Sequence, residues 1–238
     1  AIIPSYTRSL CGQCNRLRIT ADGNLLNCLY SQNEINLLSN IAQPNYGIIT
    51  NIGRAHLKGF GNIEGVIKAK SELYTYIKKN KQQIFLNQDD KTLVELAKGI
   101  KHNTYGTKAN TSGLLLENNL FTEVKYKNRK IQTKLIGDYQ FYNIMLAICV
   151  GEYFNISLNN IKKSLETYTP KNNRSEIIKT QNNTLILDAY NANPSSMTAM
   201  ITSFAKKKYT NKVCILGDML ELGEFSNSSH KEIDTLIT

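Results

Sequence analysis

One lysine of this chain occupies a position where helical periodicity predicts an apolar side chain. Apolar residues recur at helical spacing over 63–79, and Lys70 falls four residues after Val66 and three before Leu73. Burial disfavours the ammonium form, so a buried Lys70 would have a lowered pKa and could form a carbamate with carbon dioxide. A carbamate offers the hard oxygen donors that Mg²⁺ prefers. The alternative is a lysine whose stem packs while its amine reaches solvent.

A histidine lies in the glycine-rich segment before this helix. Residues 51–57 have the sequence NIGRAHL and follow an apolar run at 46–51 that predicts a buried strand. Loops after the carboxyl ends of strands are where parallel sheets hold ligands, and glycines let such a loop approach a ligand closely. His56 is therefore a candidate metal ligand. A structural or merely exposed histidine is the alternative.

Three cysteines near the start of the chain form a second candidate site. Cys11 and Cys14 form a CGQC motif, and Cys28 follows after 13 intervening residues. Thiolates at this spacing suit iron or zinc, and a reducing compartment favours a metal site over a disulfide. The other two, Cys149 and Cys214, lie in apolar runs and are expected to be small buried hydrophobes.

The elements that would position these residues alternate between strand and helix. Strands are predicted at 46–51, 83–87, 184–188 and 212–217, short hairpin strands within 104–136, and helices at 63–79, 91–98, 138–154, 157–167, 194–206 and from 226. Asp138 and Asn193 are expected as helix N-caps, with Pro194 as a first helical residue. Strand, helix and strand in this order imply right-handed crossovers and a parallel sheet, so the predicted fold class is α/β.

The overall composition is that of a globular protein with a basic surface. The 238 residues are 41% hydrophobic and 20% charged, with a formal net charge of +10. Such a charge favours anionic partners, but the lysines are scattered and no arginine stripe alternates with aromatics, so a solvated lysine-rich surface is expected rather than nucleic-acid binding. No apolar run reaches 18 residues and no leader is evident, which predicts no membrane span and a cytoplasmic location.

Four strings in the chain resemble the Mur ligase family, and are closest to its D-alanyl-D-alanine-adding branch. They are NIGRAHLKGFG at 51–61, AKSEL at 69–73, DAYNANPSSM at 188–197 and LGDMLELGE at 216–224. The resemblance covers about residues 41–238. It implies an ATP-dependent ligase of peptidoglycan synthesis, which phosphorylates the carboxylate of a UDP-N-acetylmuramoyl-tripeptide for attack by the amine of D-alanyl-D-alanine.

The resemblance also implies roles for individual residues. His56 would bind Mg²⁺, and Lys70 would be the carbamylated lysine that supports the metal and phosphate. Asn143 matches the asparagine that reads adenine, since an amide pairs with both a donor and an acceptor of that base. Arg174 matches the arginine that reaches the ATP phosphates, and Asp188 would contact the nucleotide. Asn191 belongs to the same ATP-binding string, and His230 lies in a family-like Ser-x-x-x-His stretch where an exposed helical position is expected.

The chain departs from the family in several places. Family members commonly have His-Asn where this chain has Tyr139-Gln140, and none of the 14 glycines begins a G-x-x-x-x-G-K-[ST] phosphate loop. An upstream acidic Mg²⁺ ligand and the domain for the UDP-sugar are not found either. We therefore expect a partial central domain at 41–169 without its phosphate loop, then a partial Rossmann-like domain at 170–238. The isolated chain is expected to be monomeric and inactive.

Residues 1–40 resemble a different family, the radical-SAM GTP cyclases of molybdopterin synthesis. The resemblance rests on CGQCNRLRITADG at 11–23 together with Cys28, and it covers the C-terminal cluster segment of that family. It implies a 4Fe–4S cluster on Cys11, Cys14 and Cys28. An iron–sulfur GTP cyclase remnant is therefore the alternative function.

Overall fold

The computed structural model describes most of the chain after residue 42. The described residues are 43–55, 57–116, 121–171, 173–209 and 211–237, together with the short strands β1 (Arg18–Ile19), β2 (Asn24–Leu26) and β3 (Ile35–Asn36). These three strands form a small antiparallel sheet in the order β1-β2-β3. Cys11, Cys14, Cys28 and His56 lie outside the described residues, so the predictions for them stay predictions.

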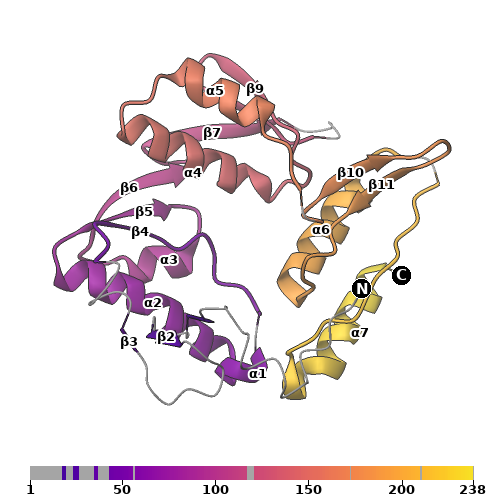
Figure 1. Ribbon diagram of the computed structural model, residues 1–238, viewed down its shortest axis with the longest axis horizontal. Coiled ribbons are helices and arrows are strands. Elements are labelled where there is room, and N and C mark those ends of the chain that lie inside the picture. The colour runs from indigo at the N-terminus through magenta and orange to yellow at the C-terminus, as the bar shows by residue number, and fades with distance from the viewer. Residues whose placement is uncertain are drawn as a thin grey trace.

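A six-stranded sheet in the order β4-β5-β6-β7-β8-β9 organises the first half of the described chain (Figure 1). Its strands are β4 (Tyr46–Ile48), β5 (Gln83–Asn87), β6 (Lys101–Gly106), β7 (Thr111–Leu116), β8 (Glu123–Tyr126) and β9 (Arg129–Gln132). The pairs from β4 to β7 are parallel, and β7-β8-β9 is an antiparallel meander. The predicted α/β class with a parallel sheet is confirmed.

Helices connect the parallel strands as the periodicity predicts. α2 (Ile63–Lys79) joins β4 to β5 with the predicted bounds, and α3 (Lys91–Leu96) joins β5 to β6 but ends two residues early. All five residues of β5 are buried, as a strand inside a parallel sheet requires. β4 is shorter than the predicted strand 46–51, since the chain leaves the sheet after Ile48.

Two helices cover the second half of this sheet. α4 (Gln140–Tyr153) packs on β5 to β8, where Ile144, Met145 and Ile148 have no exposed surface. α5 (Leu158–Thr167) begins at the predicted N-cap Ser157, whose side chain accepts from the backbone of Asn160. The predicted cap Asp138 is wrong. The N-cap of α4 is Tyr139, which makes no side-chain cap hydrogen bond, because the Asp138 carboxylate lies instead 3.6 Å from the Lys207 amine.

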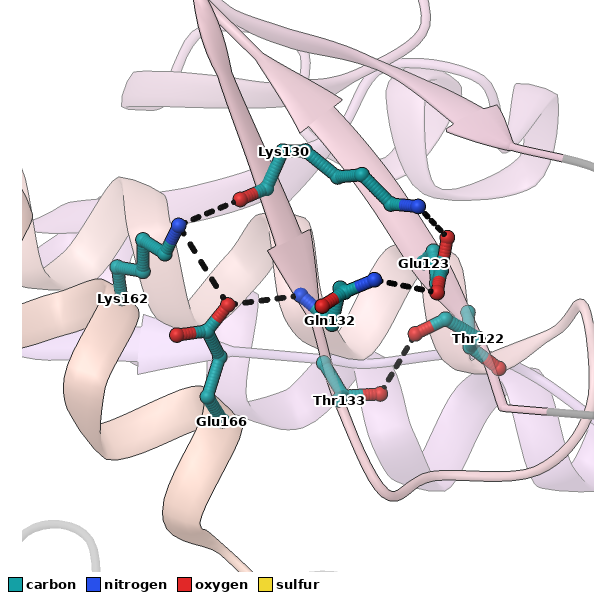
Figure 2. Close-up of polar contacts among 7 residues, drawn as sticks. All are labelled: Thr122, Glu123, Lys130, Gln132, Thr133, Lys162 and Glu166. Carbon is teal, nitrogen blue, oxygen red and sulfur yellow. Dashed lines mark hydrogen bonds and ion pairs between the residues drawn. The ribbon is translucent and has the colours of Figure 1, made fainter. Parts of the chain in front are cut away.

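The outer strand β9 is covered by α5 through polar contacts (Figure 2). Glu166 of α5 accepts from the Gln132 backbone N–H at 3.1 Å, and Lys162 donates to the Lys130 carbonyl at 2.8 Å. Within the hairpin, the Lys130 amine lies 2.6 Å from the carboxylate of Glu123, which is 8% exposed. These contacts occupy backbone groups that an edge strand would otherwise offer to another chain.

The last part of the chain contains a hairpin and two helices. They are β10 (Glu176–Lys179), β11 (Thr184–Leu187), α6 (Pro194–Lys206) and α7 (Ser226–Ile237), with a 3-10 turn at Gly223–Phe225 before α7. α6 has the predicted bounds and cap: Asn193 accepts from Ser196, and Pro194 is the first helical residue. β10 was not predicted.

The predicted strand at 212–217 is wrong. This segment is not a strand, and Val213 and Ile215 are 76% and 94% exposed. Cys214, predicted to be buried, is exposed as well. The physical reason is that a strand needs a neighbour, and within the described residues β10 and β11 pair only with each other.

A third apolar cluster joins the two halves of the described chain. Leu57, in the short helix α1 (Leu57–Phe60), and Val66 of α2 pack there with residues of α6, α7 and the segment between them. The partners from the second half are Ile201, Met219, Leu222 and Ile233. In Figure 1, α1 accordingly lies beside the start of α7.

Candidate functional site

Lys70 lies at the border of the buried face of α2, not within it. The buried positions are Val66, Ala69, Tyr74 and Ile77, while Lys70 as a whole residue is exposed, so the prediction that it sits in the buried stripe is wrong. The buried face shifts around α2 along its length, so that Ala69 rather than Lys70 faces the interior. The Lys70 side chain nevertheless folds back, so that its amine contacts the protein backbone.

The amine of Lys70 donates a hydrogen bond of 2.9 Å to the backbone carbonyl of Asn51. Partial burial of this amine lowers the pKa of Lys70 from its usual value. A lowered pKa agrees with the chemistry expected of Lys70, although the helical pattern predicted more burial of the side chain than the structure shows. A less basic amine beside the end of a parallel strand is suited to carbamate formation.

The loop after β4 is attached to the start of α6. The backbone N–H of Arg54 donates to the Ser195 hydroxyl at 2.9 Å, and a side chain at Gly53 would meet that hydroxyl at 3.2 Å. A glycine therefore allows the close approach of these two segments. This loop lies at the carboxyl end of a parallel strand, where such sheets bind ligands.

Asn143 is exposed on the first turns of α4. Its Nδ2 donates to Oε1 of Gln140 at 2.8 Å, so the two amides of this helix face are paired. Asn143 can still present its carbonyl oxygen to a ligand. The residue type and exposure fit a base-reading amide.

Arg174 stacks on an aromatic ring. Its guanidinium carbon lies 3.7 Å from the ring centroid of Tyr190, and both side chains are exposed. A cation over a ring face is held in place while its N–H groups remain directed outward. The geometry leaves Arg174 able to bind an anion such as a phosphate.

Asp188 is connected to the same segment. Its Oδ1 accepts from the backbone N–H of Ser175 at 3.0 Å, and the Ser175 hydroxyl shares a hydrogen bond of 3.1 Å with the hydroxyl of Tyr139. The structure thus brings Arg174 and Asp188 together and links them to the start of α4, one residue before Gln140. The linking residues Tyr139 and Ser175 are not among the predicted site residues, since Tyr139 stands out in the sequence only as a departure from the family pattern and Ser175 belongs to no motif.

The remaining predicted residues surround this region. Asn191 is exposed between Tyr190 and the capping box of Asn193 and Ser196 that starts α6. A cavity of about 420 Å³ lies along α6, and its walls include Ser195, Thr198, Thr202, Arg54, Tyr139 and Glu232. It is bordered by Tyr139 but not lined by Lys70, Asn143, Arg174 or Asp188.

His230 is half-buried, and the expectation of an exposed helical position is wrong. Its Nε2 accepts from the Met219 backbone N–H at 3.1 Å, and its Nδ1 lies 2.9 Å from the Ser226 carbonyl. A ring with Nδ1–H and a free Nε2 satisfies both contacts. His230 therefore holds the segment before α7.

The Mg²⁺ ligands that the family resemblance implies are only partly within the described chain. No group of three or more His, Cys, Asp or Glu side chains there is placed to hold a metal ion. The less basic Lys70 amine beside the Asn51 carbonyl does fit a hard-oxygen site once the amine is carbamylated. No helix of the described chain is long and apolar enough to cross a membrane.

Comparison with protein families gives three matches. Residues 29–151 match the Mur ligase middle domain, and residues 173–237 match the Mur ligase, glutamate ligase domain. Residues 1–56 match Molybdenum Cofactor Synthesis C. Both resemblances drawn from the sequence are confirmed.

Two curated relatives carry the same enzyme name. The chain is 34% identical over 216 residues to the UDP-N-acetylmuramoyl-tripeptide–D-alanyl-D-alanine ligase of Bacillus subtilis (strain 168), covering 87% of this chain and 47% of that protein. It is 31% identical over 214 residues to the enzyme of the same name from Haemophilus influenzae, covering 87% and 46%. The chain therefore spans about half the length of the curated relatives it matches.

Solved structures agree with the sequence comparison. MurF from Acinetobacter baumannii has a TM-score of 0.72 at 29% identity, with 85% of this chain and 46% of that chain covered. MurF ligase from Thermotoga maritima in complex with ADP has a TM-score of 0.72 at 20% identity, with 84% and 48% covered, and it supports the fold alone.

Proposed function

Because the chain belongs to the Mur ligase family, we propose that it carries part of an ATP-dependent ligase joining D-alanyl-D-alanine to a UDP-N-acetylmuramoyl-tripeptide. The relatives with this name support the substrates, and the parts of the chain matching the middle and glutamate ligase domains support amide-bond formation. A monomeric cytoplasmic enzyme of cell-wall synthesis is part of the same proposal, as is the division into parts at 41–169 and 170–238.

One observation carries the proposal: two groups suited to a nucleotide are held together beside α4. Arg174 offers a stacked cation, and Asp188 offers a carboxylate fixed through Ser175. Asn143 lies on α4 after Tyr139, whose hydroxyl contacts Ser175. These groups are the chemical counterparts of phosphate, ribose hydroxyls and adenine.

Each residue then has a separate task in binding ATP. Asn143 recognises the donor and acceptor edge of adenine, and Arg174 pairs with phosphate oxygens through its planar fork. Asp188 accepts from the nucleotide, and Asn191 lies beside the positive end of α6, where anions are favoured. His56 and carbamylated Lys70 would hold Mg²⁺, which neutralises phosphate charge when bound.

Nucleotide binding by the purified chain tests this assignment. ATP titrated into the chain and followed by ligand-observed NMR should bind, and Asn143→Ala should weaken ATP more than GTP, because the substituted amide reads the adenine edge. Asn227→Ala, an exposed asparagine on α7, is the matched control and should have no effect. Equal ATP binding by the Asn143→Ala variant would contradict the proposal.

Ligase turnover is not expected from these 238 residues alone. They contain no G-x-x-x-x-G-K-[ST] segment, and without that loop the β- and γ-phosphates lack the backbone cradle that phosphoryl transfer needs. Formation of ADP with both substrates present is the measurement. Steady turnover by the chain would show that the phosphates are held by other residues.

A second function is favoured only for the first residues of the chain. The match of residues 1–56 to Molybdenum Cofactor Synthesis C supports a cluster on Cys11, Cys14 and Cys28, as in an iron–sulfur GTP cyclase. Anaerobic reconstitution with iron and sulfide should then give a visible absorbance band. Serine at all three positions should abolish the band, and a band that survives would point to other ligands.

A further inference from the structure

We propose that Tyr139 is a positioning residue, which couples the adenine-reading helix α4 to Arg174 and Asp188 through the hydroxyl of Ser175. The proposal rests on the nucleotide site of the previous section. It adds how α4, which carries Asn143, is kept in position relative to Arg174 and Asp188. It is carried by a continuous set of contacts from Gly137 to Asp188.

The ring of Tyr139 is seated on a glycine that cannot be replaced without strain. Gly137 has φ +103°, and a side chain there would meet the Tyr139 ring at 2.3 Å. The backbone thus folds under the ring and directs its hydroxyl to Ser175, 3.1 Å away. Burial raises the pKa of Tyr139, so the phenol stays neutral and either hydroxyl can donate in this hydrogen bond.

Ser175 receives this contact in an unusual backbone conformation. It is 3% exposed and has φ +51°, in the left-handed region that residues other than glycine rarely occupy. Such a conformation persists only where its surroundings determine it. Ser175 is held from two sides, by Tyr139 at its hydroxyl and by the Asp188 carboxylate at its N–H.

The residues just before Ser175 connect it to the groups that are proposed to bind the nucleotide. The carbonyl of Asn173 accepts from the N–H groups of Ala189 and Tyr190 at 2.9 and 3.2 Å. Arg174, between Asn173 and Ser175, stacks on Tyr190. A shift of Ser175 would therefore move Arg174 and release Asp188 together, so the hydroxyl of the N-cap residue of α4 controls the placement of both groups.

Hydrogen exchange tests the coupling without any ligand. Tyr139→Phe keeps the ring on Gly137 and removes only the hydroxyl. Amide exchange measured by NMR should become roughly two- to tenfold faster at Ser175, Ala189 and Tyr190, and stay unchanged in β5. Tyr142→Phe is the matched control, since this tyrosine lies in α4 and interacts with Asp89 rather than with Ser175. Unchanged exchange at Ser175 in Tyr139→Phe would overturn the coupling.

A double variant and ATP binding separate positioning from a local structural role. If the hydroxyls act as one unit, Tyr139→Phe combined with Ser175→Ala should accelerate exchange no more than either change alone. Tyr139→Phe should also weaken ATP binding by a similar factor. Faster exchange with ATP affinity unchanged would make Tyr139 merely structural and overturn the proposal.

The same experiment distinguishes failure of this proposal from failure of the proposed function. If Asn143→Ala weakens ATP binding while Tyr139→Phe does not, the nucleotide site stands and the positioning role of Tyr139 is overturned. If the unaltered chain binds no ATP, the proposed function is overturned, and with it the role of Tyr139 toward a nucleotide.

Discussion

Arg54 and Glu232 are 178 residues apart in sequence, yet their guanidinium and carboxylate groups lie 2.7 Å apart. Arg54 belongs to the loop after β4, and Glu232 belongs to α7. The backbone N–H of Arg54 also donates to Ser195 at the start of α6. The loop that leads to Lys70 is therefore attached to both helices of the last part of the chain.

The Arg54–Glu232 pair should contribute only a little to stability. Both side chains are nearly half exposed, at 40% and 48%, and exposed pairs contribute at most about 1 kcal/mol. Arg54 lowers the pKa of Glu232, so the contribution is present above the unfolded pKa of about 4.3 and is lost as pH falls through the lower folded value. Urea unfolding of Glu232→Gln should show a small loss at pH 7 that disappears in acid.

The apolar cluster that joins the same two parts of the chain should contribute more to stability. Leu57→Ala removes a side chain that is 4% exposed and packs against α6 and α7, so a loss of about 2–5 kcal/mol is expected. The same urea series provides the comparison with Glu232→Gln. If Glu232→Gln destabilised the chain more than Leu57→Ala, the docking would be electrostatic rather than apolar.

Lys70 should be a reactive lysine. Burial lowers the pKa of Lys70, so a larger fraction of this amine is neutral at pH 8 than in an ordinary exposed lysine. Acylation at limiting reagent, read by peptide mass spectrometry, should label Lys70 faster than Lys68. The advantage should shrink above the ordinary lysine pKa of about 10.4, where an ordinary lysine amine is itself mostly neutral. Slower labelling of Lys70 would remove the basis for its carbamate.

Local patterns predicted the elements near this site better than the depth of its side chains. α2, β5 and α6 have the predicted bounds because each has a complete local signal, and α6 also has the Asn193-Pro194 start. The pattern overestimates the burial of Lys70 because it does not define where the buried face of a helix ends. Whether Ala69 or Lys70 faces inward depends on what packs against α2, and residue spacing does not contain that information.

The contacts between distant segments were the part that sequence could not predict. Tyr139 and Ser175 meet only because the chain folds back after α5, and the two residues are 36 positions apart in the sequence. His230 is half-buried because its ring accepts from the Met219 backbone, 11 residues before it. The Ser-x-x-x-His motif marked His230 as a residue of interest in the sequence, whereas Tyr139 could be noticed only as a departure from the family pattern.

The exposed segment 212–217 should tolerate charge. Ile215 is 94% exposed, so Ile215→Lys removes no buried contact and should change the free energy of unfolding by less than about 0.5 kcal/mol. The same change should reduce self-association, because it interrupts an exposed apolar run of high strand propensity. Light scattering at increasing concentration measures this effect. A large loss of stability would show that the segment packs in solution after all, as a strand would.

The ion pair inside the β8–β9 hairpin should contribute more to stability than an exposed ion pair elsewhere on the surface. Lys130→Met deprives the Glu123 carboxylate, whose side chain is 10% exposed, of its cation, and a loss of about 1–3 kcal/mol is expected. Lys98→Met removes a much more exposed pair, in which the Lys98 amine lies 2.6 Å from Glu95 and the side chains are 70% and 68% exposed, and should cost at most about 1 kcal/mol. Urea unfolding compares the two variants.

Neutralising the buried partner should restore much of the loss, because the cost of Lys130→Met comes from a carboxylate left in a poorly solvated place. Lys130→Met with Glu123→Gln keeps a group that can still bond to Gln132, whose Nε2 lies 3.0 Å from Glu123 Oε1. The double variant should therefore be more stable than Lys130→Met alone. If the two losses simply add, the hairpin is held by packing of the Lys130 stem rather than by charge.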